Sequence, residues 1–164
     1  MRNLLYLLSR IPHLSRIASR KIEEACLRGD VPTLISYYLE HPNRRVSREA
    51  NEALSRVTRC RPELILPHIE RFFESLKDGD VRKRIRAADF LSGLARDSPD
   101  LLVPHVGRLI EALSDESKGV KWEIAFALEH LVTKRPDSLA PFSDEIFRLL
   151  NEEPEVRYLS LIHI

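Results

Sequence analysis

Residues 61–69 read RPELILPHI, residues 98–106 read SPDLLVPHV, and residues 135–141 read RPDSLAP. The first prolines of these stretches lie 37 residues apart, and so do the second prolines. A leucine keeps the same spacing at positions 39, 76, 113 and 150. Three features in one phase exclude coincidence, so the chain is predicted to be an array of 37-residue units.

Each unit predicts two helices. The first helix opens with proline, whose missing N–H costs nothing at the first helical position, and an acid that suits the helix dipole follows in each unit. In the middle unit, Ser98 stands where an N-cap belongs. The second proline comes one turn later and removes an i→i−4 hydrogen bond, so the helix is expected to bend or restart there.

Apolar residues recur at helical spacing in both helices of the unit, with a short polar turn between them. In the first helices they are Ile65, Ile69, Phe72, Phe73 and Leu76, then Leu102, Val106, Leu109, Ile110 and Leu113. In the second helices they are Val46, Ala50, Ala53, Leu54 and Val57, then Ala87, Phe90, Leu91 and Leu94, then Val120, Ile124, Ala127, Leu128 and Leu131. One such helix pair cannot bury its apolar face alone, so the units are expected to stack.

The period, the paired helices and the proline in the first helix resemble HEAT repeats, a family of armadillo-like α-solenoids. Asp78 matches the acid of the family's turn, Arg84 the base early in the second helix, and residues 87–88 the paired small residues. Asp115 and Lys121 match the acid and the base one unit later. The resemblance implies an all-α fold: a right-handed α-solenoid of stacked antiparallel helix pairs.

Three residues depart from the family pattern. His41 and Ser47 replace the acid and the base in the first unit, and Lys83 stands where the other units have valine. These departures predict that no continuous ladder of Asp–Arg pairs runs along the stack.

The period divides the chain into segments. Repeats are expected at about 31–60, 61–97 and 98–134, with an incomplete repeat at 135–158 that completes a HEAT-like region of 31–158. Residues 1–30 do not fit the period and are predicted to form an irregular helical capping segment. Within it, one short helix is expected around Leu4–Leu8 and a second with Ile17, Ile22, Ala25 and Cys26, before a break at Gly29-Asp30 and a helix at Thr33–Glu40.

The last six residues, LSLIHI at 159–164, match the translation of a transposon end used in preparing sequencing libraries. This match predicts a non-native tail, so that the chain is a fragment and the natural protein continues; a real apolar tail is the alternative.

Composition excludes several classes of protein. The 164 residues are 43% hydrophobic and carry 26 Lys+Arg against 25 Asp+Glu, so neither disorder nor a strong net charge is expected. The longest apolar run near the start is five residues, too short to cross a membrane. Cys26 and Cys60 form no metal or disulfide pattern and are predicted to be small buried residues in a reducing, cytoplasmic compartment.

No catalytic, metal-binding or cofactor-binding motif occurs in the chain. His68 and His105 share a repeat position rather than ligand spacing, and His130 has no suitable neighbour one turn away. The bilin-lyase activity of some HEAT-like proteins finds no supporting residue here. A non-enzymatic protein without cofactors is therefore predicted.

Basic residues cluster where the second helices are expected to begin. The clusters are Arg44, Arg45 and Arg48, then Arg82, Lys83, Arg84 and Arg86. Residues 1–61 carry twelve basic and six acidic residues, which makes nucleic-acid binding the alternative function. Solvated, salt-bridged helix surface is the structural explanation for the same residues.

The side of the second helix opposite its apolar stripe is expected to line the concave surface of the stack. The predicted rows across it are Arg45–Arg82–Gly119, Arg48–Ile85–Trp122, Glu52–Asp89–Phe126 and Arg59–Arg96–Thr133. Acids interrupt the basic rows, whereas arginine beside exposed aromatic side chains is typical of protein-binding hot spots. The sequence thus predicts a scaffold that binds another protein through Arg45, Arg48, Arg82, Ile85, Trp122 and Phe126. Packing of the two aromatic residues against a following repeat is the competing interpretation.

Overall fold

The computed structural model describes residues 12–144, 146 and 148, and every regular element among them is helical. The prediction of an all-α fold is confirmed. The chain divides into two compact units: unit 1 comprises residues 1–69 and unit 2 comprises residues 70–164.

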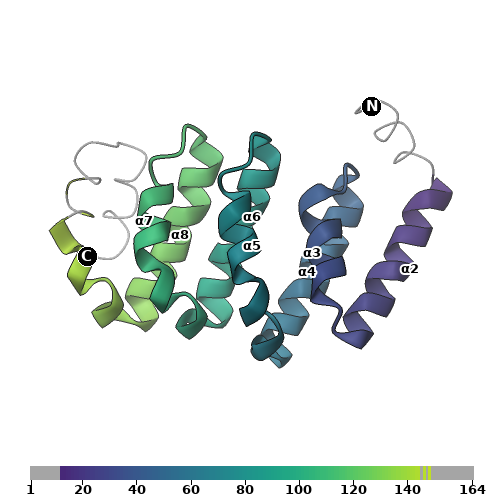
Figure 1. Cartoon of the computed structure of the whole chain (residues 1–164), viewed down its shortest axis with the longest axis horizontal. Coiled ribbons are helices and arrows are strands. Elements are labelled where there is room, and N and C mark those ends of the chain that lie inside the picture. Colours follow the sequence, from purple (N-terminus) through teal and green to yellow (C-terminus); the bar gives the residue numbers. More distant parts are fainter. Residues whose placement is uncertain (1–11, 145, 147, 149–164) are drawn as a thin grey trace. The chain divides into compact units, whose positions relative to one another are not determined.

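The described part of unit 1 holds three α-helices followed by two short 3₁₀ turns (Figure 1). These elements are α2 (Pro12–Arg28), α3 (Val31–Glu40), α4 (Arg44–Cys60), η1 (Pro62–Leu64) and η2 (Leu66–His68). Helices α2 and α3 both pack on α4. Ile22, Leu34 and Leu54 supply one buried apolar side chain from each helix to their common core.

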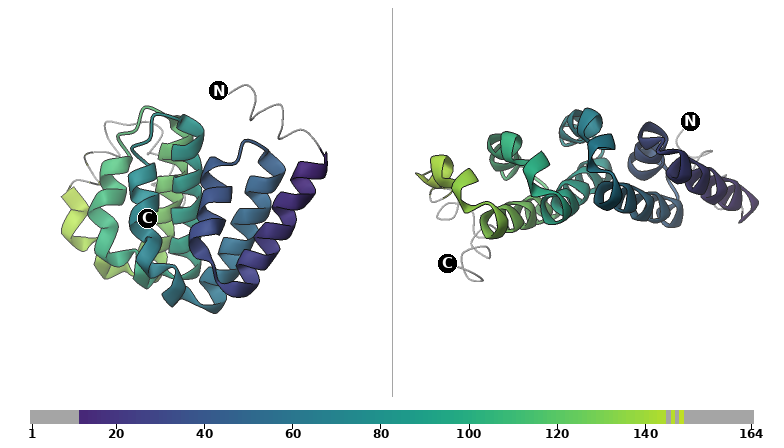
Figure 2. Two further views of the ribbon diagram at one scale, coloured as in Figure 1. Left: turned by 45° about the vertical axis from the view of Figure 1, so that its right-hand side comes forward. Right: turned by 90° about the horizontal axis from the view of Figure 1, so that it is seen from below.

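Unit 2 repeats a pattern of a short helix followed by a long one. Its elements are α5 (Ile69–Ser75), which begins at the last residue of unit 1, α6 (Val81–Asp97), η3 (Pro99–Leu101), η4 (Val103–His105), α7 (Val106–Ala112), α8 (Lys118–Lys134), η5 (Pro136–Ser138) and η6 (Ala140–Phe142). The long helices α6 and α8 pack along each other, and α7 packs against α8. The further views show α5 and α7 in one layer of this unit and α6 and α8 in a second (Figure 2).

All residues of the apolar stripes predicted for the helices of the repeats are buried. In unit 2 the rings of Phe72 on α5 and Phe90 on α6 stack with their centroids 4.0 Å apart. Outside the stripes, Gly119 permits a close approach of the two long helices: a Cβ added to Gly119 of α8 would lie 2.9 Å from Cδ1 of Ile85 on α6. The sequence therefore located the core of both units correctly.

The proline-rich segment differs from the prediction in its local geometry. The prediction placed the first helix from its first proline onward, but two consecutive 3₁₀ turns occupy this stretch before the α-helix starts at Ile69 or Val106. The N–H groups of Ile65 and His68 donate to the carbonyls of Pro62 and Ile65 at 3.0 and 2.8 Å. A continuous α-helix would need a backbone N–H at the second proline, which proline lacks. The α-helix therefore starts only after this proline, as the expected restart predicts.

Ser98 does not act as the predicted side-chain cap. Its side chain makes no capping hydrogen bond, and its N–H instead donates to the carbonyl of Leu94 at 2.7 Å, which ends α6. In the 3₁₀ turn that follows, Pro99 has no N–H and the N–H of Leu101 donates to the carbonyl of Ser98 at 3.1 Å, so few backbone donors are left for a side-chain cap.

The polar turn before each long helix uses one recurring hydrogen bond. A side-chain acceptor binds the backbone N–H two residues later, as in an Asx turn. The pairs are Asp80 N–H to Asp78 Oδ1 at 2.9 Å, Ser117 N–H to Asp115 Oδ1 at 2.7 Å, and Asn43 N–H to His41 Nδ1 at 3.2 Å. The histidine that departs from the family pattern thus makes the same turn contact as the aspartates.

Helix α2 presents a different stripe from the one expected. Ile22 and Ala25 are buried as predicted and Cys26 is partly buried, but Ile17 is 42% exposed and Ala18 is buried in its place. The buried positions 18, 22 and 25 are separated by four and three residues, as on one face of a helix. The buried stripe therefore begins at Ala18, one residue after the predicted Ile17. The break after the helix is confirmed, and α3 begins at Val31 rather than Thr33.

The two cysteines do not share one environment. The prediction that both are buried is wrong for Cys60, which is exposed at the last position of α4. Position 60 continues the spacing of Ala53 and Val57, but Cys60 is the last residue of α4, where the helix ends and the side chain is exposed.

Gly29 ends α2 in the left-handed conformation, with φ of +70°. We expect Gly29→Ala to lower the free energy of unfolding by about 1–2 kcal/mol, because an L-residue is strained at positive φ. The added Cβ would also lie 3.1 Å from Cδ1 of Leu64. Denaturant unfolding followed by circular dichroism measures the change, and Gly79→Ala is the control because its Cβ would meet nothing within 4 Å. Equal unfolding curves for the two variants would contradict the prediction.

Some predictions fall outside the described residues. They are the helix around Leu4–Leu8, most of the second half of the incomplete repeat at 135–158, and the suspected non-native tail at 159–164.

Candidate partner-binding surface

The first basic cluster lies on the opening turns of α4 in unit 1. Arg44, Arg45 and Arg48 are all exposed. Nε of Arg45 donates to Oε1 of Glu49 at 2.9 Å, one helical turn away. The arginines of this cluster lie on the surface. They are accessible, as both the predicted protein-binding site and the alternative nucleic-acid-binding site require.

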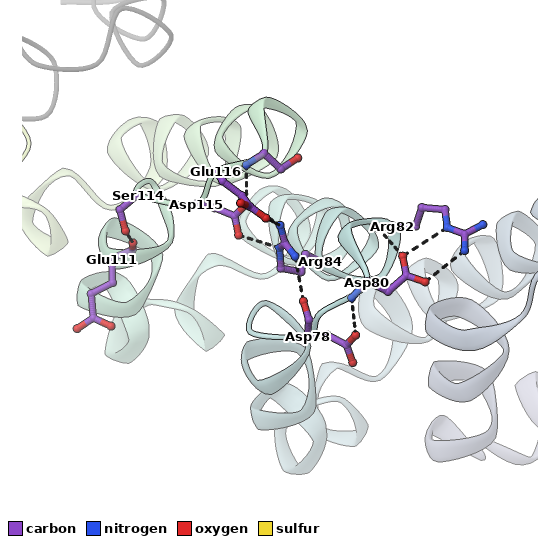
Figure 3. A network of polar contacts seen from close by, with 9 residues as sticks. Asp78, Asp80, Arg82, Arg84, Glu111, Ser114, Asp115 and Glu116 are labelled. Atoms are coloured by element: carbon purple, nitrogen blue, oxygen red, sulfur yellow. Dashed lines mark hydrogen bonds and ion pairs between the residues drawn. The ribbon is translucent and has the colours of Figure 1, made fainter. Parts of the chain in front are cut away.

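The second basic cluster, at the start of α6 in unit 2, is largely engaged by neighbouring acids (Figure 3). Nη2 of Arg82 and Oδ2 of Asp80 are 3.2 Å apart, and Nζ of Lys83 is 2.8 Å from Oδ2 of Asp78. The lysine that departs from the apolar pattern thus pairs with the turn acid of its own unit. Arg82 remains exposed, whereas Lys83 is half-buried.

Arg84 is a structural residue rather than a surface ligand. It is only 8% exposed, with Nε 2.9 Å from Oδ2 of Asp115 and Nη2 3.0 Å from Oε1 of Glu116 in the next polar turn. Its Nη1 also donates to the carbonyl of Asp78 at 3.0 Å. Hydrogen bonding to Asp115 raises the pKa of Arg84, and Glu116 adds to the effect. Arg84, which the sequence analysis placed among the candidate nucleic-acid contacts, is therefore not accessible to a ligand, because it is buried and its guanidinium binds two carboxylates.

Trp122 and Phe126 lie together on α8, four residues apart on one side of the helix. The indole is 48% exposed, and the two rings meet edge to face with centroids 5.2 Å apart. Ile85 of α6 is partly exposed and lies against Gly119, one turn before Trp122. The structure therefore brings together three of the predicted partner-binding residues in unit 2. Of the other predicted partner-binding residues, Arg82 lies at the start of α6 in unit 2, and Arg45 and Arg48 belong to unit 1.

Two carboxylates beside these aromatic rings were not predicted as site residues. Glu123 follows Trp122 on α8, and Asp89 on α6 is close enough to influence its ionisation. Burial raises the pKa of Glu123, and the negative charge of Asp89 raises it further. The sequence signal was present, since Glu123 and Phe126 are three residues apart on one helix face.

The raised pKa of Glu123 implies that stability depends on pH. A carboxyl whose pKa is higher in the folded than in the unfolded state loses stability as pH rises through the unfolded value, because the folded state holds its proton longer. We therefore expect Glu123→Gln to raise Tm at about pH 7.5 and to leave it nearly unchanged at about pH 3, which is below the ordinary glutamate pKa of about 4.3, so that both states are protonated. Thermal unfolding at the two pH values tests this, with Glu111→Gln on exposed α7 as control. A gain that persists at the lower pH would show that charge is not its cause.

A shallow groove of about 300 Å³ lies between α5 and α7, on the other layer of unit 2. Phe73, Arg108 and Glu111 are among its lining residues. The guanidinium of Arg108 lies 4.0 Å from the centre of the Phe73 ring, and its Nη1 is 2.7 Å from Oε1 of Glu70. The pKa of Glu70 is lowered by this hydrogen bond. These contacts join α5 and α7, and they engage Arg108, the basic side chain of the groove, with Phe73 and Glu70.

The histidines have structural surroundings. The ring of His105 lies 5.1 Å from that of Phe73, and burial lowers the pKa of His130. Within the described ranges, no group of three potential ligands is arranged to hold a metal ion. No described helix combines the length and apolar character needed to span a bilayer.

The described part of the chain is thus all-helical, and its unit 2 exposes the aromatic pair Trp122–Phe126 on α8. Comparisons with models of protein families, with curated proteins and with solved structures found no match to it.

Proposed function

We propose that this chain is a HEAT-like right-handed α-solenoid and a non-enzymatic scaffold that binds a partner protein through the exposed side of its long second helices. The second helices α4, α6 and α8, each of 17 residues, begin at residues 44, 81 and 118, in step with the 37-residue spacing of the sequence. Stacked helix pairs of this kind offer extended surfaces for binding. A cytoplasmic location belongs to the same proposal.

The observation that carries the proposal is the exposed pair Trp122–Phe126. A tryptophan that is half exposed, held by a neighbouring ring and flanked by partly exposed Ile85, supplies the large rigid contact area common at hot spots. Packing against a following repeat remains the competing interpretation of the same residues.

Trp122→Ala separates the two interpretations. If the ring binds a partner, the variant keeps the helical circular dichroism and a Tm close to that of the unaltered chain, but loses at least about tenfold in affinity for selected ligands. Peptides selected from a random display library on the full chain serve as ligands, and a fluorescent label on each peptide reports binding by anisotropy, because the variant lacks the sole tryptophan. Val132→Ala, at another exposed apolar position of α8, is the control. A large fall in Tm would instead identify Trp122 as a packing residue.

Nucleic-acid binding is the second candidate, favoured by α4. This helix exposes five arginines, Arg44, Arg45, Arg48, Arg56 and Arg59. Neutralising phosphates releases counterions, so duplex binding would weaken steeply between about 50 and 200 mM salt. A titration with labelled duplex and single strands over that range tests this candidate, and absence of binding at the lower salt would exclude it.

A further inference from the structure

The exposed side of α4 carries an ordered set of charges. We define the α4 arginine face as Arg45, Arg48, Glu52, Arg56 and Arg59, all of which are exposed. At about 100° per residue these positions fall within an arc of about 80°, opposite the buried stripe of the helix. Glu52 stands in the middle, one helical turn from Arg48 and from Arg56. The face therefore presents two arginines at each end and one carboxylate between them.

Most of this charge is not used inside the protein. Arg48, Arg56 and Arg59 make no ion pair with another residue that the structure describes, and neither does the central carboxylate. Arg45 lies 2.9 Å from Glu49 on the edge of the face. An exposed ion pair one turn apart in a helix contributes only a factor of about two to an equilibrium, so such local pairing would not exclude a partner.

The fold does not require arginine at these positions. The equivalents of Arg48 in the next two second helices are Ile85 and Trp122, and the equivalents of Arg56 are a glycine and a histidine. The second helices of unit 2 thus form and pack without a permanent charge at either place. Helix formation and packing therefore do not account for the exposed arginines of α4.

Arginine and glutamate in this order select the chemistry of a partner. Every basic residue of α4 is an arginine, and a guanidinium binds a carboxylate or a phosphate through two parallel N–H groups. A nucleic-acid strand is negative along its whole length, so it would bring phosphates to Glu52 without compensation. A protein segment instead places carboxylates opposite the arginines and a cation opposite Glu52. Charge complementarity on this face therefore favours an acidic protein segment.

We propose that the α4 arginine face binds an acidic segment of the partner protein, whose carboxylates contact the arginines at both ends of the face while a basic residue lies opposite Glu52. At about 1.5 Å per residue, the two ends are about 16 Å apart, a distance that a partner helix matches with acidic residues three turns apart. The inference rests on the proposed function, since it specifies the partner of one of the long second helices.

The direct test titrates the full chain with two labelled, alanine-rich helical peptides of equal composition and follows fluorescence anisotropy. The matched peptide carries glutamates at the spacing of the four arginines and a lysine at the spacing of Glu52. In the permuted peptide, the lysine and one terminal glutamate exchange places. We expect the matched peptide to bind saturably and about tenfold more tightly, because the exchange replaces two exposed ion pairs with like charges, and to weaken as salt is added. Equal affinity for the two peptides, or no saturable binding, would overturn the proposal.

Variants at exposed positions identify the residues responsible. Arg48→Gln combined with Arg56→Gln should weaken the matched peptide about tenfold, from two- to fivefold for each exposed ion pair lost. Arg28→Gln removes an exposed charge from α2 in the same unit and should bind like the unaltered chain. Glu52→Lys should reverse the preference, since the central glutamate of the permuted peptide would then lie opposite a lysine. Equal weakening by Arg28→Gln, or an unchanged preference in Glu52→Lys, would contradict the proposal.

Two further results separate this proposal from the other candidates. An oligothymidylate strand that binds more tightly than the matched peptide would identify α4 as a nucleic-acid site and overturn the acidic partner. Display-selected peptides that require Trp122, together with a matched peptide that does not bind, would keep the scaffold function and overturn only the acidic partner. Failure of both kinds of peptide would overturn both.

Discussion

Phe72→Ala is expected to lower the free energy of unfolding by about 3–5 kcal/mol. The side chain is completely buried in unit 2 and stacks on Phe90 with ring centroids 4.0 Å apart. Truncation loses the favourable free energy of burying a large apolar group and the contact between the two rings. It also leaves a cavity that close-packed helices fill only in part. Because a domain is commonly stable by only about 5–15 kcal/mol, this loss would be a large share of the total.

Guanidinium unfolding monitored by helical circular dichroism measures the change. Val132→Ala is a suitable comparison, because it truncates an apolar side chain at a position of α8 that is 42% exposed, and its effect should stay within about 0.5 kcal/mol. If both variants lost the same stability, Phe72 would not belong to a packed core.

The second large effect concerns the ion pair between α6 and the following polar turn. We expect Asp115→Asn to lower Tm markedly, because the buried guanidinium of Arg84 would lose its main carboxylate while Glu116, which is mostly exposed, compensates poorly. Asparagine keeps an oxygen that can accept the N–H of Ser117, so the turn itself is preserved and the measured loss reports the charge.

The matched control is Asp100→Asn. Asp100 binds Nε and Nη2 of Arg135 at 2.6 and 2.9 Å, but both side chains are exposed, so water and salt screen this pair. Its variant should change Tm much less, and only its effect should disappear in about 1 M salt. Similar losses for the two variants, or equal sensitivity to salt, would contradict a special role for the buried pair.

The core was predictable because burial in a helix is periodic. Spacings of three and four residues placed Leu102, Val106 and Leu109 on one face, and all three are buried. The prolines likewise marked where the α-helix restarts. Their sequence did not reveal that the stretch before the restart is 3₁₀, because both geometries accept proline at their first position.

The surface was harder to predict because a charged side chain has no period of its own. Arg84 and Arg82 are two residues apart in one basic cluster, yet the first is buried between carboxylates and the second is exposed. Only the position of the next polar turn distinguishes them. For Glu123 the sequence offered only its three-residue spacing from Phe126, and the influence of Asp89 could not be predicted because Asp89 belongs to another helix.

The two residues that replace the acid and the base of the family pattern in the first repeat, His41 and Ser47, still make hydrogen bonds at the turn. His41 accepts the turn hydrogen bond that aspartate accepts elsewhere, and Ser47, in the place of the basic residue, donates from Oγ to the carbonyl of Tyr38 at 2.7 Å. A hydrogen-bonding role can be kept while a charge is lost. The sequence therefore predicted correctly where the turn lies and not which contacts hold it.

The packing of α6 on α8, with α7 between them in the chain, has a consequence for how unit 2 forms. In the chain, α6 and α8 are separated only by the short helix α7 and the turns beside it. Bringing the two long helices together therefore costs little loop-closure entropy. Chains whose contacts join near neighbours in sequence reach the native state faster than sheets with distant pairings. The same locality allows one helix pair to form first and serve as the template on which the adjacent pair condenses.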